Sequence, residues 1–248
     1  MWLTLGGVTT RDGVLSLADV AVRAGAEPFS TSGPTPGELA AAAEEAETGE
    51  GVLIVTLARQ MSATFDAACL AAGTAPPGRV RVVDSRSAAG GEALVALAAA
   101  RRSAAGGDLS QVTAAAEKAA ARVSLVAAVA DLGHLARSGR VPAAAARAGQ
   151  ALGVRPLFQL RQGRVRALRP ARGGEPALRR LVAAPSAERR AGRLHAAVLH
   201  ACDEAAAATV LDGVRARYAP ASAFAGGFSP VMVAHTGPGL VGIAWWWE

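Results

Sequence analysis

Short apolar runs alternate with longer amphipathic stretches along the first half of the chain. The runs at 52–57 and 80–83 are rich in Val and Leu, and stretches with helical spacing follow them at 62–72 and 91–102. An uninterrupted β-branched run is typical of a parallel strand that is buried on both faces. Strands that alternate with helices indicate a parallel sheet covered by helices. The pattern predicts a three-layer α/β/α domain with a parallel sheet over residues 1–122.

Smaller elements are predicted ahead of these runs. Two short strands joined by a Gly-Gly turn open the chain, and a helix over 16–24 has Ser16 as its N-cap. Residues 29–36 are predicted to form a polar loop. Within it, Thr35 suits the cap of the next helix and Pro36 suits its first position.

The pattern changes after residue 122. Two stretches, 155–161 and 164–168, are joined by a Gln-Gly turn and predict a β-hairpin. The other predicted strands of this half are 124–129, 195–202, 231–235 and 240–245, and its predicted helices are 132–137, 142–149, 175–183 and 203–217. Hairpins mixed with helices indicate a smaller two-layer α/β domain with a mixed sheet over residues 123–248.

Composition narrows the choice of partners. The chain of 248 residues is 51% hydrophobic and 4% aromatic, so its core must be built mainly from Ala, Val and Leu. The net charge is +6, and Lys118 is the only lysine among the basic residues, which indicates a compositional bias rather than a basic binding face. The arginines are not interleaved with aromatic residues as in nucleic-acid-binding surfaces, so no nucleic acid is expected as a partner.

Targeting and cysteine patterns indicate a cytoplasmic protein. No apolar run reaches about 18 residues, the length that a membrane span needs, and the first residues lack the pattern of a signal peptide. Cys69 and Cys202 lie far apart and show no CxxC spacing, so they are predicted to be buried free thiols in a reducing compartment. Phosphate-loop, dinucleotide, zinc-protease and nucleophile-elbow signatures are absent, and the histidines lack metal-ligand spacing, so we expect no metal or cofactor.

Hydroxyl-rich loops at strand ends are the remaining candidates for chemistry. Ser62 is predicted to be the N-cap of the helix that follows the strand 52–57, and Thr31 and Ser32 precede another helix. Ligands of an open α/β sheet bind outside the carboxyl ends of its strands. A helix N-terminus offers free N–H groups to an anion. These hydroxyls therefore either form an anion site or only cap helices.

A histidine at the end of the predicted strand 231–235 could complete such a site. His235 is followed by a glycine-rich turn, so its ring can face a cleft and donate a hydrogen bond to a carboxylate. A carboxylate held by hydroxyls, helix N–H groups and one imidazole needs neither lysine nor metal. If the ligand has a long apolar tail, the Ala- and Val-rich interior between the two domains can bury it.

Six segments in chain order resemble the DegV family of fatty-acid-binding proteins. The turn after His235 matches the family pattern HTGPG, and the segment MSATFDAA matches the family pattern LSGTYQSA. The matching residues are 29–38, 61–68, 83–88, 137–141, 154–157 and 235–239. The segments cover nearly the whole chain and lie at compatible spacing, which makes the combined match specific.

The resemblance implies a role for each matching residue. Thr31 and Ser62 would bind the carboxylate of a long-chain fatty acid together with His235, and the neighbouring Ser32 and Ala63 belong to the same site. Two arginines, Arg140 and Arg172, would dock a partner protein. Bacterial members of the family present the bound fatty acid to a fatty acid kinase, which forms an acyl-phosphate. The resemblance therefore implies a lipid-binding protein of phospholipid metabolism that is not itself an enzyme.

The chain departs from the family pattern at three places. Family members begin about thirty residues earlier with a strand that ends in Asp-Ser, so the first strand of the sheet is expected to be missing here. Ala63 replaces a glycine where the backbone would approach the carboxylate, and Ala58-Arg59 replaces two serines. These changes bear on ligand affinity more than on the fold.

Two other functions remain as alternatives. The first is a serine-dependent acyl hydrolase, with Ser62 as nucleophile, His235 as base and Asp84 as the third member of a triad. The second is a basic interaction module for anionic partners, whose affinity would fall steeply with salt.

Overall fold

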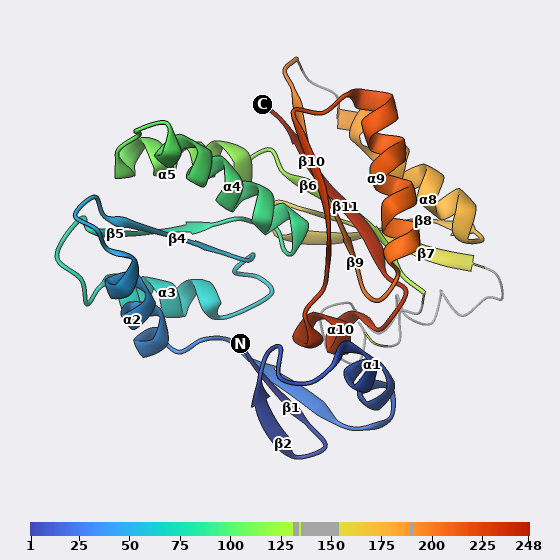
Figure 1. The fold of residues 1–248 in the computed structure, drawn as a ribbon, viewed down its shortest axis with the longest axis horizontal. Coiled ribbons are helices and arrows are strands. Elements are labelled where there is room, and N and C mark those ends of the chain that lie inside the picture. Colours follow the sequence, from blue (N-terminus) through green and yellow to red (C-terminus); the bar gives the residue numbers. More distant parts are fainter. Residues whose placement is uncertain (131–133, 135–153, 189–190) are drawn as a thin grey trace.

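The described residues form three sheets (Figure 1). The computed structural model describes residues 1–130, 134, 154–188 and 191–248. The strand orders are β2-β1-β3, β4-β5 and β10-β9-β11-β6-β7-β8. The predicted helices at 132–137 and 142–149 lie outside the described residues, except for His134.

The first sheet is a small antiparallel one. Its strands are β1 (Trp2–Leu5), β2 (Val8–Arg11) and β3 (Phe29–Ser32), with β1 in the centre. Leu3 and Leu5 are each 1% exposed, so one face of β1 is closed against the core. Helix α1 (Leu17–Ala26) follows β2 and has Ser16 as its N-cap, as predicted.

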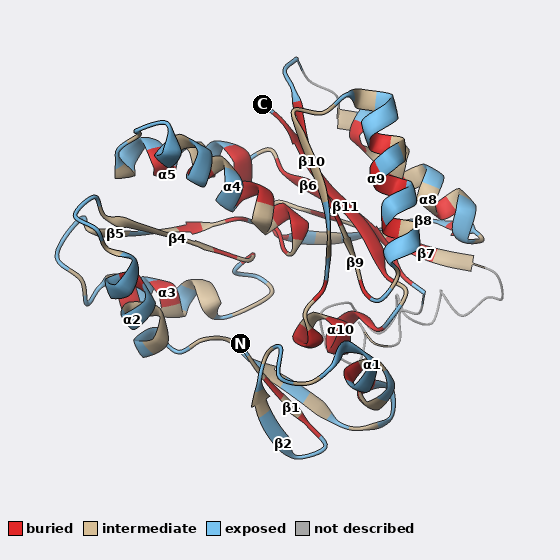
Figure 2. Ribbon diagram, in the orientation of Figure 1, coloured by how far each residue is buried: buried red, intermediate tan, exposed pale blue. Residues whose placement is uncertain are grey.

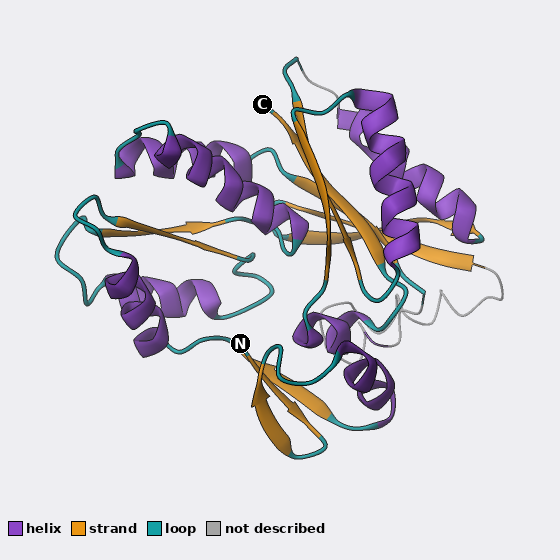
Figure 3. Ribbon diagram, in the orientation of Figure 1, coloured by secondary structure: helices purple, strands orange, loops and turns teal. Residues whose placement is uncertain are grey.

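The second sheet is the middle layer of the predicted three-layer arrangement. Strands β4 (Val52–Thr56) and β5 (Val80–Asp84) are parallel. Helices α2 (Pro36–Ala46) and α3 (Thr64–Ala72) cover one face, and α4 (Gly90–Ala104) and α5 (Leu109–Ala120) cover the other (Figure 3). Helix α2 begins with the capping box that Thr35 and Glu38 form, and Pro36 stands at its first position.

The third sheet has six strands and mixed direction, which confirms the predicted two-part α/β class. Its strands are β6 (Ser124–Ala128), β7 (Val154–Arg161), β8 (Arg164–Arg172), β9 (Leu194–His200), β10 (Ser222–Gly227) and β11 (Val241–Trp247). Strands β9 and β10 are parallel, and the other neighbours are antiparallel. Helices α8 (Gly174–Ala183) and α9 (Glu204–Tyr218) cover one face, while α4 packs on the other. All seven residues of β11 are buried, including its three tryptophans (Figure 2).

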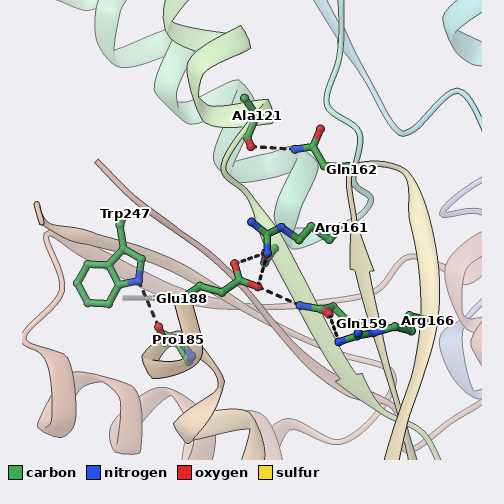
Figure 4. A network of polar contacts seen from close by, with 9 residues as sticks. Ala121, Gln159, Arg161, Gln162, Arg166, Pro185, Glu188 and Trp247 are labelled. Atoms are coloured by element: carbon green, nitrogen blue, oxygen red, sulfur yellow. Dashed lines mark hydrogen bonds and ion pairs between the residues drawn. The ribbon is translucent and has the colours of Figure 1, made fainter. Parts of the chain in front are cut away.

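A polar network ties the segment after α8 to this sheet (Figure 4). The carboxylate of Glu188, at the end of the 3-10 helix Ala184–Glu188, lies 3.0 Å from Arg161 Nη1. The same carboxylate accepts hydrogen bonds from Gln159 Nε2 at 3.1 Å and from Ser124 Oγ at 2.7 Å. Because these partners stand on β6 and β7, one side chain holds the 3-10 helix to two strands.

The core runs through both predicted domains. One cluster of buried side chains joins Leu3 of β1, Leu94 and Val95 of α4, and Ala197 and Ala244 of the six-stranded sheet. Helix α4 therefore belongs to the packing of both parts. The division of the chain at residue 122 stays a prediction.

The structure corrects several local predictions. Residues 231–235 are not a strand but part of helix α10 (Pro230–Thr236), because Pro230 suits the first turn of a helix and Gly237, with φ of 68°, ends it. Phe29–Ser32 is a strand rather than a loop, since β1 supplies it with backbone partners. Ser222–Gly227 is a strand that the sequence pattern did not predict.

The exposure of the two cysteines also differs from the prediction. Both Cys69 and Cys202 are free thiols, as predicted, but both are exposed rather than buried. Cys69 lies on α3, where the buried positions are the small residues Ala68 and Ala71, so no stripe of large apolar side chains identifies the inward face. None of the helices in the described part of the chain combines the length and the hydropathy that a membrane span requires.

Candidate functional site

Thr31 and His235 meet although they are 204 positions apart. Thr31 Oγ1 lies 2.8 Å from His235 Nε2. Thr31 and Phe29 occupy alternate positions of β3 and so face the same side. The Phe29 ring makes an edge contact with the imidazole, with centroids 5.4 Å apart and planes at 68°. His235 is 9% exposed, so its ring is held between this strand and the body of α10.

Ser62 forms a second polar contact at the start of α3. Ser62 Oγ lies 2.8 Å from Thr64 Oγ1 and accepts a hydrogen bond from the Thr64 backbone N–H at 3.2 Å. The helix begins at Thr64 with Ala63 as its N-cap, so the prediction of Ser62 as N-cap is wrong by one residue. The Ser62 hydroxyl still accepts a hydrogen bond from a backbone N–H at the start of α3, as in a short turn that is closed by a serine side chain.

The position of Gly33 shows that these two contacts lie near each other. A Cβ atom on Gly33 would lie 2.9 Å from Thr64 Oγ1 and 3.9 Å from Ser62 Oγ, so the segment after β3 passes directly over the hydroxyl pair. Because Thr31 is two residues earlier on the same segment, the structure brings Thr31, Ser62 and His235 into one region. Three hydroxyls and one imidazole can together donate several hydrogen bonds to a carboxylate.

Two other residues of the predicted site, Ser32 and Ala63, do not add their side chains to this group. Ser32 is exposed and occupies the opposite face of β3 from Thr31. Ala63 is exposed at the N-cap of α3 and has only backbone groups to offer. The side chains that the structure gathers are therefore those of Thr31, Ser62 and His235.

Two residues of this region were not predicted. Thr64 was missed although a Ser-x-Thr spacing at a strand-to-helix loop is a usable signal for a hydroxyl pair. Phe29 was missed because the sequence pattern predicts a loop at 29–36, and the alternation of side chains between two faces applies only to a strand. Within the described residues no cluster of three His, Cys, Asp or Glu side chains could hold a metal ion.

The hydrogen bonds of Ser62, His235 and Asp84 do not form the catalytic triad that the hydrolase alternative requires. The hydroxyl beside His235 Nε2 is that of Thr31, whereas Ser62 Oγ faces Thr64. Asp84 Oδ1 accepts the backbone N–H of Arg86 at 2.7 Å within its own turn. Nucleophilic catalysis by Ser62 would need the serine within hydrogen-bond reach of the base.

The predicted docking arginines lie elsewhere. Arg140 falls outside the described residues. Arg172 is the last residue of β8, an edge strand of the six-stranded sheet. With Arg169, Arg179 and Arg180 it lines an open hollow of about 760 Å³ between β8 and α8. Arg179 pairs with Glu175, and Arg180 donates to the Arg169 carbonyl, so the hollow keeps an excess of positive charge.

Comparisons of the sequence and of the fold with known proteins show the family to which this chain belongs. The model of the family described as "Uncharacterised protein, DegV family" matches residues 3–248. A DegV domain-containing protein of Mycobacterium bovis is 38% identical over 97% of this chain and 86% of its own length. Another from Streptomyces coelicolor is 35% identical over 87% of this chain and 78% of its own length.

Solved structures match over the whole chain. A DegV family protein from Thermus thermophilus, described as binding fatty acid, superposes with a TM-score of 0.90 at 30% identity, covering 100% of this chain and 90% of that one. DegV of Bacillus subtilis, described as a fatty acid binding protein, gives a TM-score of 0.81 at 26% identity with the same coverage. By its sequence and by its fold, this chain belongs to the DegV family.

Proposed function

We propose that this protein binds a fatty acid and holds its carboxylate between Thr31, Ser62 and His235. The contact between Thr31 Oγ1 and His235 Nε2 carries the proposal, because it brings a hydroxyl and an imidazole together beside the Ser62 region. Hydrogen bonds to a charged group are worth roughly 1.5–3 kcal/mol each. The N-cap position of Ala63 adds a backbone N–H at the start of α3.

Apolar side chains adjoin the polar ones. Phe29 and Met61, which neighbour Thr31 and Ser62 along the chain, are partly buried and pack against the main core cluster. An acyl chain whose carboxylate lies at the hydroxyls would extend along these side chains into the interior between the two parts of the molecule. Related DegV proteins that are described as binding fatty acids support this class of ligand.

Native mass spectrometry and titration with a long-chain fatty acid test this function. The purified protein is expected to carry extra mass equal to a fatty acid, and Thr31→Ala, Ser62→Ala and His235→Ala should each weaken binding by roughly tenfold or more. Ser30→Ala is the matched control, since Ser30 is exposed on the other face of β3. A folded wild-type protein without bound lipid or measurable affinity would refute the proposal.

We further propose that the loaded protein presents its ligand to a fatty acid kinase in the cytoplasm, with Arg140 and Arg172 in the docking surface. The positive hollow beside Arg172 suits an acidic patch on such a partner. Two exposed free thiols also suit a reducing compartment. In an assay of acyl-phosphate formation, Arg172→Glu should raise the protein concentration needed for half-maximal rate by roughly tenfold.

The control residue for the docking experiment, Arg164, lies on the same strand as Arg172. Arg164, at the other end of β8, is exposed, and Arg164→Glu changes the net charge by the same amount. Equal effects of the two variants would show a general charge effect and contradict docking at Arg172. Fatty acid affinity should stay unchanged in both variants, because neither arginine adjoins the carboxylate site.

A further inference from the structure

The helix that carries His235 begins in an unusual way. Ser229 is the N-cap residue of α10 and Pro230 is its first residue. A serine at the N-cap normally caps the helix with its own hydroxyl, and proline suits the first position. The Ser229 side chain makes no capping hydrogen bond. Instead, the Val231 N–H donates to Asp12 Oδ1 at 3.0 Å, across 219 positions of sequence.

Asp12 is itself held by the first sheet. It follows β2 directly, and its backbone N–H donates to the Met1 carbonyl at 3.0 Å. Strand β1 pairs with β2 on one side and with β3 on the other, so Asp12 and Thr31 belong to one small sheet. The sheet therefore contacts α10 twice, through Asp12 at Val231 and through Thr31 at His235.

The two contacts are one helical turn apart. Val231 and His235 are separated by four positions, so they lie on the same side of α10, and α1 also packs against this helix. Val231 is fully buried, so its N–H would lose its acceptor without gaining water if Asp12 were removed. The helix would then have to turn or shift until Ser229 or another group capped it.

We propose that Asp12 is a positioning residue for the fatty acid site: its carboxylate, rather than the hydroxyl of Ser229, fixes the start of α10 and so sets His235 against Thr31. This inference rests on the proposed function of the site. It assigns to the turn after β2 a role in ligand affinity although Asp12 does not contact the ligand. It also explains why a helix of seven residues can hold an imidazole at a fixed place.

Three variants of the full chain test the proposal by two measurements, and Thr31→Ala serves as the reference for the second. Fatty acid affinity is measured by titration, and the His235 imidazole ¹⁵N chemical shifts are measured by NMR without ligand. Asp12→Ala is expected to weaken binding by roughly tenfold and to move the His235 signals toward those of Thr31→Ala. Asp12→Asn, whose amide oxygen can accept the same bond, should restore most of the affinity and the wild-type signals. Ser229→Ala should change neither.

The outcomes separate this inference from the proposed function. Wild-type affinity together with unchanged His235 signals in Asp12→Ala would overturn it, and so would equal losses in Asp12→Ala and Ser229→Ala. If Asp12→Ala does not fold, Asp12→Glu, which displaces the carboxylate by one methylene, should still shift the His235 signals, and unchanged signals would again overturn the inference. Failure of the wild-type protein to bind any fatty acid would refute the proposed function, while the NMR comparison would still test the role of Asp12.

Discussion

Glu92 lies in the first turn of α4, where most of its carboxyl group is removed from water. This burial raises the pKa of the Glu92 carboxyl to about 7. Its helical position places it one turn before Ala96, which lines a second hollow, of about 390 Å³, beside β4. A charged carboxylate at this point opposes folding, because burial favours the neutral form.

Replacing this carboxyl should stabilise the protein above neutral pH. The folded-state pKa lies above the unfolded value of 4.5, so the native state binds more protons and stability falls as pH rises from about 4.5 to about 7. Glu92→Gln removes this loss, and the gain in unfolding free energy at pH 8 should be roughly 2–3 kcal/mol larger than at pH 4.5. Urea unfolding at the two pH values measures the difference. An equal effect of the substitution at both would contradict the assignment.

At the scale of elements, the C-terminal strand β11 packs against a buried histidine. His195 of β9 is 5% exposed and stacks on Trp246 of β11, with ring centroids 5.1 Å apart. Its Nδ1 lies 2.7 Å from Arg101 Nη1 of α4, and its Nε2 lies 3.5 Å from the Glu248 carboxylate. Burial, and next the positive charge of Arg101, hold the pKa of His195 below its usual 6.5, and Arg193 adds a smaller effect in the same direction.

Acid should therefore loosen the contact between α4 and these strands. Because the folded pKa is depressed, the unfolded state takes up the proton first, and stability that is present above pH 6.5 is lost as pH falls through the folded-state pKa. Arg101→Met should raise the pKa of His195 toward its usual value, which an NMR titration of the imidazole would show. A pKa that is unchanged or lower in this variant would mean that Arg101 does not act on the ring.

At the scale of the whole molecule, the continuous core predicts that the two parts unfold together. Leu3 of β1, Leu94 of α4 and Trp246 of β11 belong to one buried cluster. A shared core gives a single cooperative transition, whereas independent domains give two. In a Cys202→Ser variant, a dye on the exposed Cys69 reports on the first part, and tryptophan fluorescence reports chiefly on the second. Coincident urea midpoints are expected, and separate midpoints would show that the parts are independent domains.

Local signals predicted most of the elements and part of the site. The capping residues Ser16 and Thr35 identified the starts of α1 and α2, because capping depends on neighbours in sequence. The apolar runs identified β4, β5 and β11 in the same way. The prediction of a strand at 231–235 is wrong because a short Val-rich run suits either element. The local residues Pro230 and Gly237 bound the helix, and its packing against α1 supports it.

The sequence by itself determined the family, the α/β class, the caps of α1 and α2 and the hydroxyls and histidine that are candidates for the ligand, because each of these depends on residue type and local spacing. The tertiary structure decided which of the candidates meet. It placed Thr31 against His235, and turned the Ser32 side of β3 outward. It also supplied the cap of α10 from Asp12 rather than Ser229. Contacts between residues more than 200 positions apart depend on how sheets and helices pack, and no local pattern in the chain encodes that geometry.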